Sequence, residues 1–384
     1  MKKILLSPLM RLRFSGIAAL TLAAAALPLP ASAGFIQTNL ISDIPGLALL
    51  TDPVLKNPWG LSHSATSPIW VSDQGTSVTT LYNINAAGVT KVNQVSILPG
   101  GVGTGPTGQV NNSNTTAFIL TNSVAASFIF ANLNGTISAW NNGLGFTQAQ
   151  IRVTTPGAAY TGLAIGSNAS GPLLYAANTA QNRIDVFNGS FSSVNLGASA
   201  FATPVAISAL GLVPFNVQNI GSNVYVTYAL PGRAAQTSAP EGSGAVAVFD
   251  MSGNFVKTLA TDSKLASPWG IVMAPASFGP FGGDLLVGNF SFLASEINAF
   301  DPTTGLLLGT IPIDPGVGNT AGGLWGLIVG NGVNGGLANT VYFADGINGE
   351  VNGLFASLAF VPEPASMALL GLGLIGVAFS RRRT

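Results

Sequence analysis

Hydrophobic positions between residues 34 and 360 occur in short runs that recur along the chain. The runs are rich in Val, Ile, Phe and Tyr, and examples are Ile69–Asp73, Leu174–Asn178 and Val341–Asp345. Turns that contain Gly, Asn, Asp or Pro separate the runs. Runs of this kind predict β-strands, and the 3.6-residue spacing of an amphipathic helix is essentially missing from this stretch. The pattern therefore predicts an all-β domain over residues 34–360.

One short motif recurs through this domain at a nearly constant interval. Asn57-Pro-Trp-Gly-Leu61 returns as Ser267-Pro-Trp-Gly-Ile271 and as Gly323-Leu-Trp-Gly-Leu327. Related segments centred on residues 161 and 215 lie between them, about 54 residues apart, and Pro106–Val110 divides the remaining long gap. Six units of about four strands each predict a six-bladed β-propeller. We expect an N-terminal strand within residues 34–42 to complete the last blade and so remove an open sheet edge.

The N-terminus has the three-part layout of a secretory signal peptide. Basic residues between Lys2 and Arg13 precede an apolar run over 16–27 and the small residues 31–33. This order predicts a signal peptide over residues 1–33, cleaved after Ala33. The alternative is an uncleaved membrane anchor, which the short apolar core and the helix-ending Pro28 and Pro30 disfavour.

The C-terminal segment, residues 361–384, contains a Pro-Glu-Pro tripeptide, an apolar run over 366–380 and an arginine cluster. The arginines would hold an inserted helix with its C-terminus in the cytoplasm. The order of these parts resembles the PEP-CTERM sorting signal. The motif residues are Pro362, Glu363, Pro364, Arg381, Arg382 and Arg383.

This resemblance implies export to the cell surface, the outer membrane or the extracellular space of a Gram-negative bacterium that makes extracellular polysaccharide. It also implies processing by an exosortase-type sorting enzyme and a transient membrane anchor through 366–380. A second resemblance lies at Asn182-Arg-Ile184, followed by Phe187, which is similar to the repeat of NHL and related six-bladed propellers. The whole architecture resembles an uncharacterised family of PEP-CTERM propeller proteins, which implies fold and export but no established activity.

Charge and cysteine content narrow the choice of partners. The whole chain is formally neutral, but residues 34–361 contain seven basic and 13 acidic residues, a net charge of −6. Nucleic acid is therefore not an expected partner, because phosphate binding needs clustered Lys and Arg. The chain has no cysteine, so its fold cannot depend on disulfides and it cannot use a cysteine nucleophile.

Five of the six units carry Asp or Asn at the same position, and the fourth unit has Ala229 there. By pseudo-symmetry these side chains would form a ring of oxygen ligands at one end of the propeller, and Ca²⁺ accepts such ligands. Six-bladed lactonases, which the fold resembles, hold a calcium ion at the axis. The alternative is that each residue closes its hairpin through an Asx turn. The five candidate ligands are Asp73, Asn132, Asn178, Asn289 and Asp345, and apart from this possible Ca²⁺ we expect no cofactor.

The insertion between Tyr228 and Ala245 departs from the repeat and contains Arg233 and Glu241. Long loops on a rigid scaffold often bind ligands, so these two residues are candidates for a binding loop. The alternative is a flexible insertion that the fold tolerates.

The remaining candidates favour structure over catalysis. Trp59, Trp269 and Trp325 could be platforms for sugar rings, but their identical place in three units favours a packing role. The single histidine, His63, has no Gly-x-Ser-x-Gly motif or other identifiable partner, so we predict no catalytic residue.

These features favour a non-catalytic binding or structural module at the surface or in the extracellular matrix, which presents one propeller face to a polysaccharide or a surface protein. The alternative is a calcium-dependent hydrolase of lactonase or gluconolactonase type. A bound metal ion distinguishes the two hypotheses.

Overall fold

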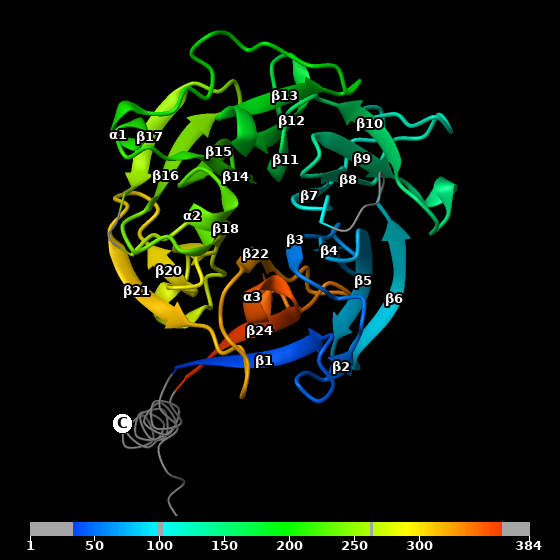
Figure 1. Ribbon diagram of the computed structural model, residues 1–384. Helices are drawn as coiled ribbons and strands as arrows, with labels where there is room; N and C mark the ends of the chain where they lie inside the picture. Colours follow the sequence, from blue (N-terminus) through cyan, green and yellow to red (C-terminus); the bar gives the residue numbers. More distant parts are fainter. Residues whose placement is uncertain (1–33, 98–102, 262–263, 363–384) are drawn as a thin grey trace, which may run out of the picture. The chain divides into compact units, whose positions relative to one another are not determined.

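The computed structural model describes residues 34–97, 103–261 and 264–362. These residues form six sheets arranged around a common axis, as in a six-bladed β-propeller (Figure 1). The predicted signal peptide and the apolar run over 366–380 lie outside the described residues. Within the described ranges, no helix is long and apolar enough to cross a membrane.

Each of the first five blades starts with a strand next to the axis and continues outward by antiparallel pairing. The first blade contains β3 (Pro58–Ser62), β4 (Ile69–Asp73), β5 (Val78–Asn85) and β6 (Gly88–Ser96), and the second β7 (Gln109–Asn111), β8 (Phe128–Ala131), β9 (Thr136–Trp140) and β10 (Gln150–Thr154). The third contains β11 (Tyr160–Asn168), β12 (Gly171–Asn178) and β13 (Arg183–Asn188), and the fourth β14 (Val213–Ile220), β15 (Asn223–Ala229), β16 (Gly244–Asp250) and β17 (Phe255–Ala260). The fifth contains β18 (Pro268–Met273), β19 (Leu285–Asn289), β20 (Glu296–Phe300) and β21 (Leu307–Pro312).

The sixth blade joins the two ends of the described chain. It contains β22 (Leu324–Val329), β23 (Val341–Asp345), β24 (Leu354–Val361), β1 (Gly34–Ser42) and the short β2 (Leu50–Thr51). Strand β1 pairs antiparallel with β24, from Gly34 opposite Val361 to Ser42 opposite Leu354. The predicted closure by an N-terminal strand is thus confirmed, and it pairs an edge of the last blade that would otherwise be open.

The third blade differs from the predicted four strands. Its sheet has three, and beyond β13 the pairing continues only as an isolated bridge between Phe187 and Ser193. Asn188 accepts hydrogen bonds from the backbone N–H groups of Ser190 and Ser192 through its side chain, at 2.9 and 3.0 Å. This side chain stabilises a tight turn, after which the chain makes only one bridge before it leaves the sheet.

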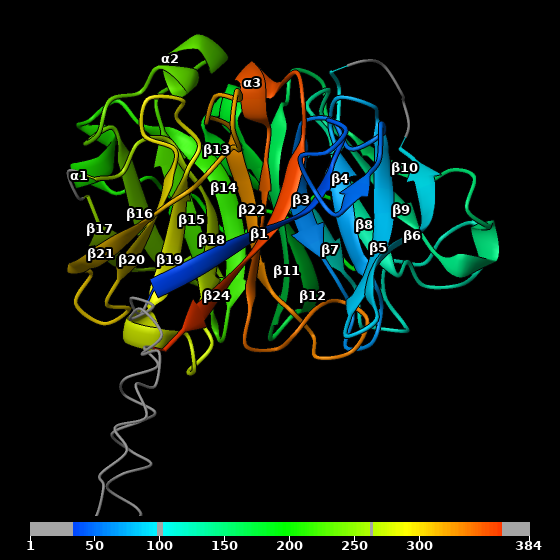
Figure 2. The same ribbon diagram turned by 90° about the horizontal axis from the view of Figure 1, so that it is seen from below.

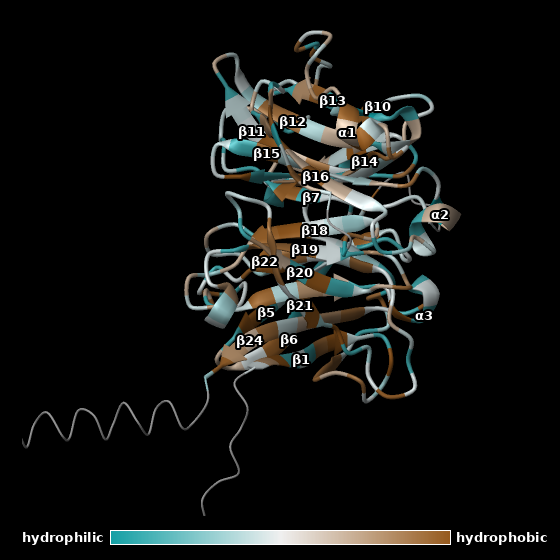
Figure 3. Cartoon of the chain, turned by 90° about the vertical axis from the view of Figure 1, so that its left-hand side faces the viewer, coloured by the Kyte–Doolittle hydropathy of each residue, from teal (hydrophilic) through white to brown (hydrophobic). Residues whose placement is uncertain are grey.

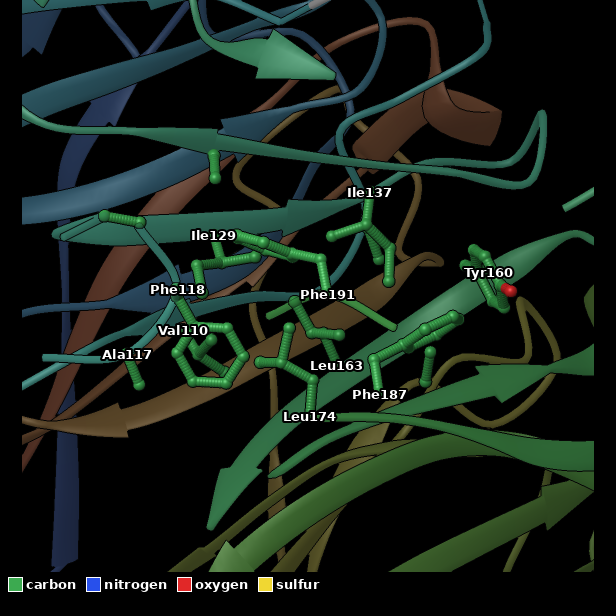
Figure 4. Packing of buried hydrophobic residues seen from close by; sticks show 14 of the residues in the cluster. Val110, Ala117, Phe118, Ile129, Ile137, Tyr160, Leu163, Leu174, Phe187 and Phe191 are labelled. Atoms are coloured by element: carbon green, nitrogen blue, oxygen red, sulfur yellow. The ribbon is translucent and has the colours of Figure 1, made fainter. Parts of the chain in front are cut away.

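Neighbouring blades pack through hydrophobic side chains on their facing strands. Between the second and third blades, Ile129 and Ile137 belong to the same buried cluster as Leu163, Leu174 and other residues (Figure 4). Hydrophobic stretches recur on the strands of other blades, including β18, β20 and β22 (Figure 3). Burial of this surface is the main stabilising contribution that the repeat can supply without disulfides.

The inner strands approach one another closely because a glycine follows most of the motif anchors. A Cβ atom on Gly270 would overlap the carbonyl oxygen of Trp325, and one on Gly326 would lie 2.5 Å from that of Trp59. The fourth blade has Asn216 at this position, and its Nδ2 donates to the carbonyl oxygen of Trp269 at 2.8 Å. The repeated Trp-Gly pair is therefore a packing motif around the axis.

Candidate functional site

An aromatic cluster fills part of the axis at the end where the inner strands begin. It contains the motif anchors of four blades, Trp59, Phe215, Trp269 and Trp325, together with Phe290, all of them buried. The rings of Trp59 and Trp325 stack with their centroids 3.4 Å apart, and those of Trp325 and Phe290 are 4.2 Å apart. The prediction that the three tryptophans pack in the core is confirmed.

The other two blades have threonine at the anchor position. Thr107 donates to the carbonyl oxygen of Tyr160 at 2.7 Å, and Thr161 donates to that of Phe215 at 2.6 Å. Threonine is much smaller than tryptophan, so the aromatic packing does not extend over these blades. A cavity of about 480 Å³ is lined by residues that include Trp59 and Thr161. We call it the axial cavity.

The axial cavity has apolar walls with a few convergent polar groups. Its amide side chains are those of Asn57, Gln74 and Gln236, and its charged side chains are Arg233 and Glu350. Cavities of this size, lined mainly by apolar groups with a few polar ones, are typical of small-ligand sites.

Arg233 comes from the insertion in the fourth blade, where it begins the short helix α2 (Arg233–Thr237). Its guanidinium carbon lies over the aromatic cluster, 4.2 Å from the centre of the Phe290 ring, 4.9 Å from that of Trp325 and 5.3 Å from that of Trp59. Its Nη2 also forms an ion pair with Glu350. Burial lowers the pKa of Arg233 and the carboxylate of Glu350 opposes that shift, so the guanidinium remains charged.

Glu350 lies in the short segment α3 (Ile347–Glu350), which follows strand β23. Asn348, Gly349 and Glu350 all have left-handed backbone conformations, with φ values of 58°, 65° and 69°. Such conformations are strained for residues with side chains and are often found at functional sites. Segments α2 and α3 lie at the same end of the propeller (Figure 2).

Several hydrogen-bond donors of the cavity are unused. Asn57 is engaged on both sides, because its Oδ1 accepts from Trp325 Nε1 at 3.1 Å and its Nδ2 donates to Gln74 Oε1 at 2.8 Å. In contrast, Trp59 Nε1, which is buried, has no hydrogen-bond partner among the described residues. Over the same ranges, no partner is found for Gln74 Nε2 or for the side-chain amide of Gln236. The side-chain amides of Gln74 and Gln236 line the cavity and could bind the oxygen atoms of a ligand, whereas Trp59 Nε1 is fully buried.

The five predicted metal ligands occupy equivalent places at the ends of the second strands, as the repeat indicated. None of them lines the axial cavity. In three blades the next residue along the chain does so instead, namely Gln74, Leu133 and Thr179. The predicted ring of oxygen atoms therefore does not face this cavity.

The three asparagines use their amides in hydrogen bonds to backbone groups. Asn132 Nδ2 donates to the carbonyl oxygen of Thr136 at 3.2 Å, and Asn178 Oδ1 accepts from the N–H of Gln181 at 3.2 Å. Asn289 Nδ2 donates to the carbonyl oxygen of Lys264 at 2.7 Å. Such bonds give the repeated position a structural role.

The two aspartates are buried and differ from the asparagines. Asp73 Oδ2 accepts from the Thr80 hydroxyl at 2.7 Å, whereas Asp73 Oδ1 and both oxygens of Asp345 have no hydrogen-bond partner in the described part of the chain. Burial raises the pKa of both carboxyls well above the ordinary range, and the charge of Glu350 adds to the shift at Asp345. No three His, Cys, Asp or Glu side chains within the described ranges are grouped as a metal site. Calcium binding by the predicted residues stays a prediction.

Two further candidates lie away from the cavity lining. Glu241, at the end of the insertion, forms an ion pair with Lys264 at 2.6 Å. His63 follows the far end of β3, and its Nε2 lies 2.8 Å from the carbonyl oxygen of Val329 in the sixth blade. Of the two residues proposed for the binding loop, the structure therefore brings only Arg233 to the axial cavity.

Comparisons with known proteins agree with the sequence motif and with the fold. The model of the PEP-CTERM protein-sorting motif matches residues 360–383. Two uncharacterized proteins of Acanthamoeba polyphaga mimivirus are similar: R648 is 30% identical over 278 residues, covering 68% of this chain and 66% of the relative, and L690 is 29% identical over 280 residues, covering 68% and 70%. This chain thus spans about two thirds of the length of these relatives.

Among solved structures, a streptogramin B lyase superposes with a TM-score of 0.50 and 11% identity, covering 85% of this chain and 98% of the lyase. At that identity the similarity shows the fold alone. The PEP-CTERM motif indicates an exported, sorted protein that is processed by an exosortase-type enzyme. The chain is therefore a six-bladed β-propeller protein that ends in a PEP-CTERM sorting motif.

Proposed function

We propose that this protein is a carbohydrate-binding module that acts outside the cell and holds a sugar unit of an extracellular polysaccharide in the axial cavity. The observation that carries the proposal is the arrangement at that cavity, where the guanidinium of Arg233 lies over the aromatic cluster and pairs with Glu350. The predicted signal peptide over 1–33 and the membrane segment over 366–380 belong to the same proposal, since both serve export and surface display.

The chemistry of the cavity suits a sugar. Sugars present hydroxyl groups at their rims and apolar C–H groups on their faces, so they need planar polar side chains next to aromatic or aliphatic surface. Gln74 and Gln236 supply amides, Arg233 and Glu350 supply a charged donor and a charged acceptor, and Trp59 lines the wall. Residues 34–361 have a net charge of −6, which repels anionic ligands at long range and so favours a neutral sugar over an acidic one.

The second candidate, a calcium-dependent hydrolase of lactonase type, has one observation in its favour. Three buried carboxyl oxygens, Asp73 Oδ1 and both oxygens of Asp345, have no hydrogen-bond partner within the described ranges. A cation could satisfy them. The axial cavity itself does not fit such an ion, because its charged lining is an Arg–Glu pair and one wall is aromatic.

The test is calorimetric titration of the full chain, purified in a mild detergent, with a panel of neutral and acidic oligosaccharides. We expect saturable binding of at least one sugar with one site per chain, and loss of about tenfold or more in affinity when Gln236 is replaced by Ala. Glu241→Gln, in the same insertion but outside the cavity, is the matched control and should bind as the wild type does. Absence of binding across the panel, together with tight calcium binding and lactone hydrolysis, would favour the second candidate.

A further inference from the structure

We infer that Glu350 determines the ligand class of the axial cavity, because it neutralises Arg233 and so restricts the site to uncharged sugars. This inference rests on the carbohydrate-binding function proposed above. It assigns Glu350 a role in specificity that concerns the kind of sugar bound: neutral hexoses are accepted and sugars that carry a carboxylate are rejected.

The charged side chains that line the axial cavity balance each other. Arg233 and Glu350 are the only charged side chains that line it in the described part of the chain, and they form an ion pair with each other. The cavity therefore has a net charge of zero. Without Glu350, the same cavity would present an uncompensated guanidinium, which is the group best suited to bind a carboxylate.

The fold holds both members of the Arg233–Glu350 ion pair in place. The guanidinium rests on the faces of Phe290 and Trp325, and its side chain is 39% exposed. The side chain of Glu350 is only 15% exposed and follows two left-handed residues, so its position is set by the backbone of α3. A ligand that displaced either partner would have to break an ion pair supported by the fold.

Gly346 allows the backbone before Glu350 to approach Asn57 closely. A Cβ atom at Gly346 would lie 2.5 Å from Asn57 Oδ1 and 3.2 Å from Glu350 Cγ. The loop therefore packs Glu350 close to Asn57, a cavity-lining residue that is fixed by hydrogen bonds to Trp325 and Gln74. Glu350 is therefore a fixed part of the cavity wall.

The Arg233–Glu350 ion pair affects the binding of neutral sugars and of acidic sugars in opposite ways. A neutral hydroxyl group can accept from Arg233 and donate to Glu350 at the same time, which leaves the ion pair intact. A carboxylate would place a second negative charge beside Glu350 in a partly buried site, where like charges repel strongly. The side-chain amide of Gln74 can donate to either ligand and does not discriminate between them.

The experiment compares two probes of equal length, a glucose oligosaccharide and one that contains glucuronate, on the full chain in mild detergent. We expect the wild type to bind the neutral probe at least about tenfold more tightly. Glu350→Gln keeps the shape of the side chain but frees the charge of Arg233, so it should strengthen glucuronate binding about tenfold or more. Neutral binding should not strengthen in this variant, because the amide replaces a charged acceptor of the sugar hydroxyl with a neutral one. Glu241→Gln should match the wild type for both probes.

The double variant Arg233→Gln with Glu350→Gln should lose the gain in glucuronate binding, because the freed charge is then absent. If the Glu350→Gln chain does not fold, Arg233→Gln tests the same claim from the other partner and should weaken glucuronate binding further. An unchanged ratio of the two affinities in Glu350→Gln, or a wild type that prefers glucuronate, would overturn this inference alone. Failure of both probes to bind the wild type would overturn the proposed function with it.

Discussion

Trp325 Nε1 donates a hydrogen bond to Asn57 Oδ1 at 3.1 Å, and this bond joins the motif anchor of the last blade to the residue that begins the first motif. Asn57 has a left-handed backbone, with a φ of 46°, and its counterparts Ser267 and Gly323 have φ values of 49° and 87°. The first position of the repeated motif thus needs a residue that tolerates this conformation, which Asn, Gly and a few others do.

Asn57→Ala is expected to lower the free energy of unfolding by about 1–3 kcal/mol, because it leaves the buried N–H of Trp325 without an acceptor. Alanine is also strained at positive φ, which glycine is not. Asn57→Gly is therefore the control, since it removes the amide without the strain and should be less destabilising than Asn57→Ala. Chemical denaturation followed by tryptophan fluorescence measures both, and equal stability of Asn57→Ala and the wild type would contradict the structural role of this bond.

Gly270→Ala is expected to destabilise the propeller by several kcal/mol or to prevent folding, because the new methyl group would overlap the backbone oxygen of Trp325 in the next blade. The matched control is Gly288→Ala in the same blade, where the nearest atom is a terminal methyl of Leu324 at 3.0 Å. A side chain can move aside where a backbone oxygen cannot, so the control should cost much less. Thermal unfolding of the two variants decides the point, and a larger loss for Gly288→Ala would show that the inner strands are not closely packed.

Ile41→Ala tests the closure of the ring. Ile41 is fully buried in β1, so its truncation is expected to cost about 2–5 kcal/mol. Ile36, on the same strand, is 54% exposed, and Ile36→Ala should change stability by less than about 0.5 kcal/mol. Urea unfolding provides the comparison; similar effects of the two substitutions would argue against pairing of β1 with β24 in solution.

Asp345→Asn is expected to stabilise the protein at neutral pH, by on the order of 1–3 kcal/mol. Burial raises the pKa of Asp345 in the folded state, so the folded protein retains a proton that the unfolded chain releases above about pH 4. The stability contributed by this group is therefore complete below that pH and declines as the pH rises toward the folded-state pKa. Asparagine removes this dependence, and the equivalent positions in other blades already accommodate Asn132, Asn178 and Asn289.

The measurement is urea unfolding of the wild type and of Asp345→Asn from about pH 3 to pH 8, with a chelator present. The two proteins should converge in stability at the acidic end and separate as the pH rises. Repeating the series with added calcium tests the alternative: if Asp345 is a metal ligand, calcium should stabilise the wild type and the substitution should abolish that effect. A substitution that lowers stability at neutral pH even with the chelator would contradict the buried, protonated aspartic acid.

The repeat was sufficient to predict the blades because the residue types within each unit favour strands and turns locally. Asp250 and Asp301 each accept hydrogen bonds from backbone N–H groups of the following residues, at 2.7–2.9 Å, and Gly253 and Gly305 adopt positive φ in the same turns. Asp and Gly are among the turn-forming residue types that separate the predicted strands. The absence of a fourth strand from the sheet of the third blade was not predicted, because local β propensity does not show whether an outer strand finds a pairing partner.

The candidate site was predictable only in part. Arg233 stood out because its loop interrupts the repeat, but its position over the aromatic cluster depends on contacts with Trp59, Phe290 and Trp325 from three different blades. Thr161 was a usable signal, since a small anchor among large ones leaves room at the axis, and this residue lines the cavity. Glu350 carried no signal of its own, because nothing local relates it to a loop more than a hundred residues earlier.

The sequence by itself determined the class of fold, the six units, the closing strand and the sorting motif, because these follow from residue types at short and regular spacing. Only the tertiary structure decided which side chains face the axis. The repeated Asp and Asn residues and the residues that follow them are adjacent in sequence, yet only the latter line the axial cavity, as Gln74 and Thr179 show. Gln74 lies in a turn and Thr179 begins a short 3-10 helix, so the direction of their side chains depends on how the chain leaves each strand. Which side meets the axis is set by the packing of all six blades.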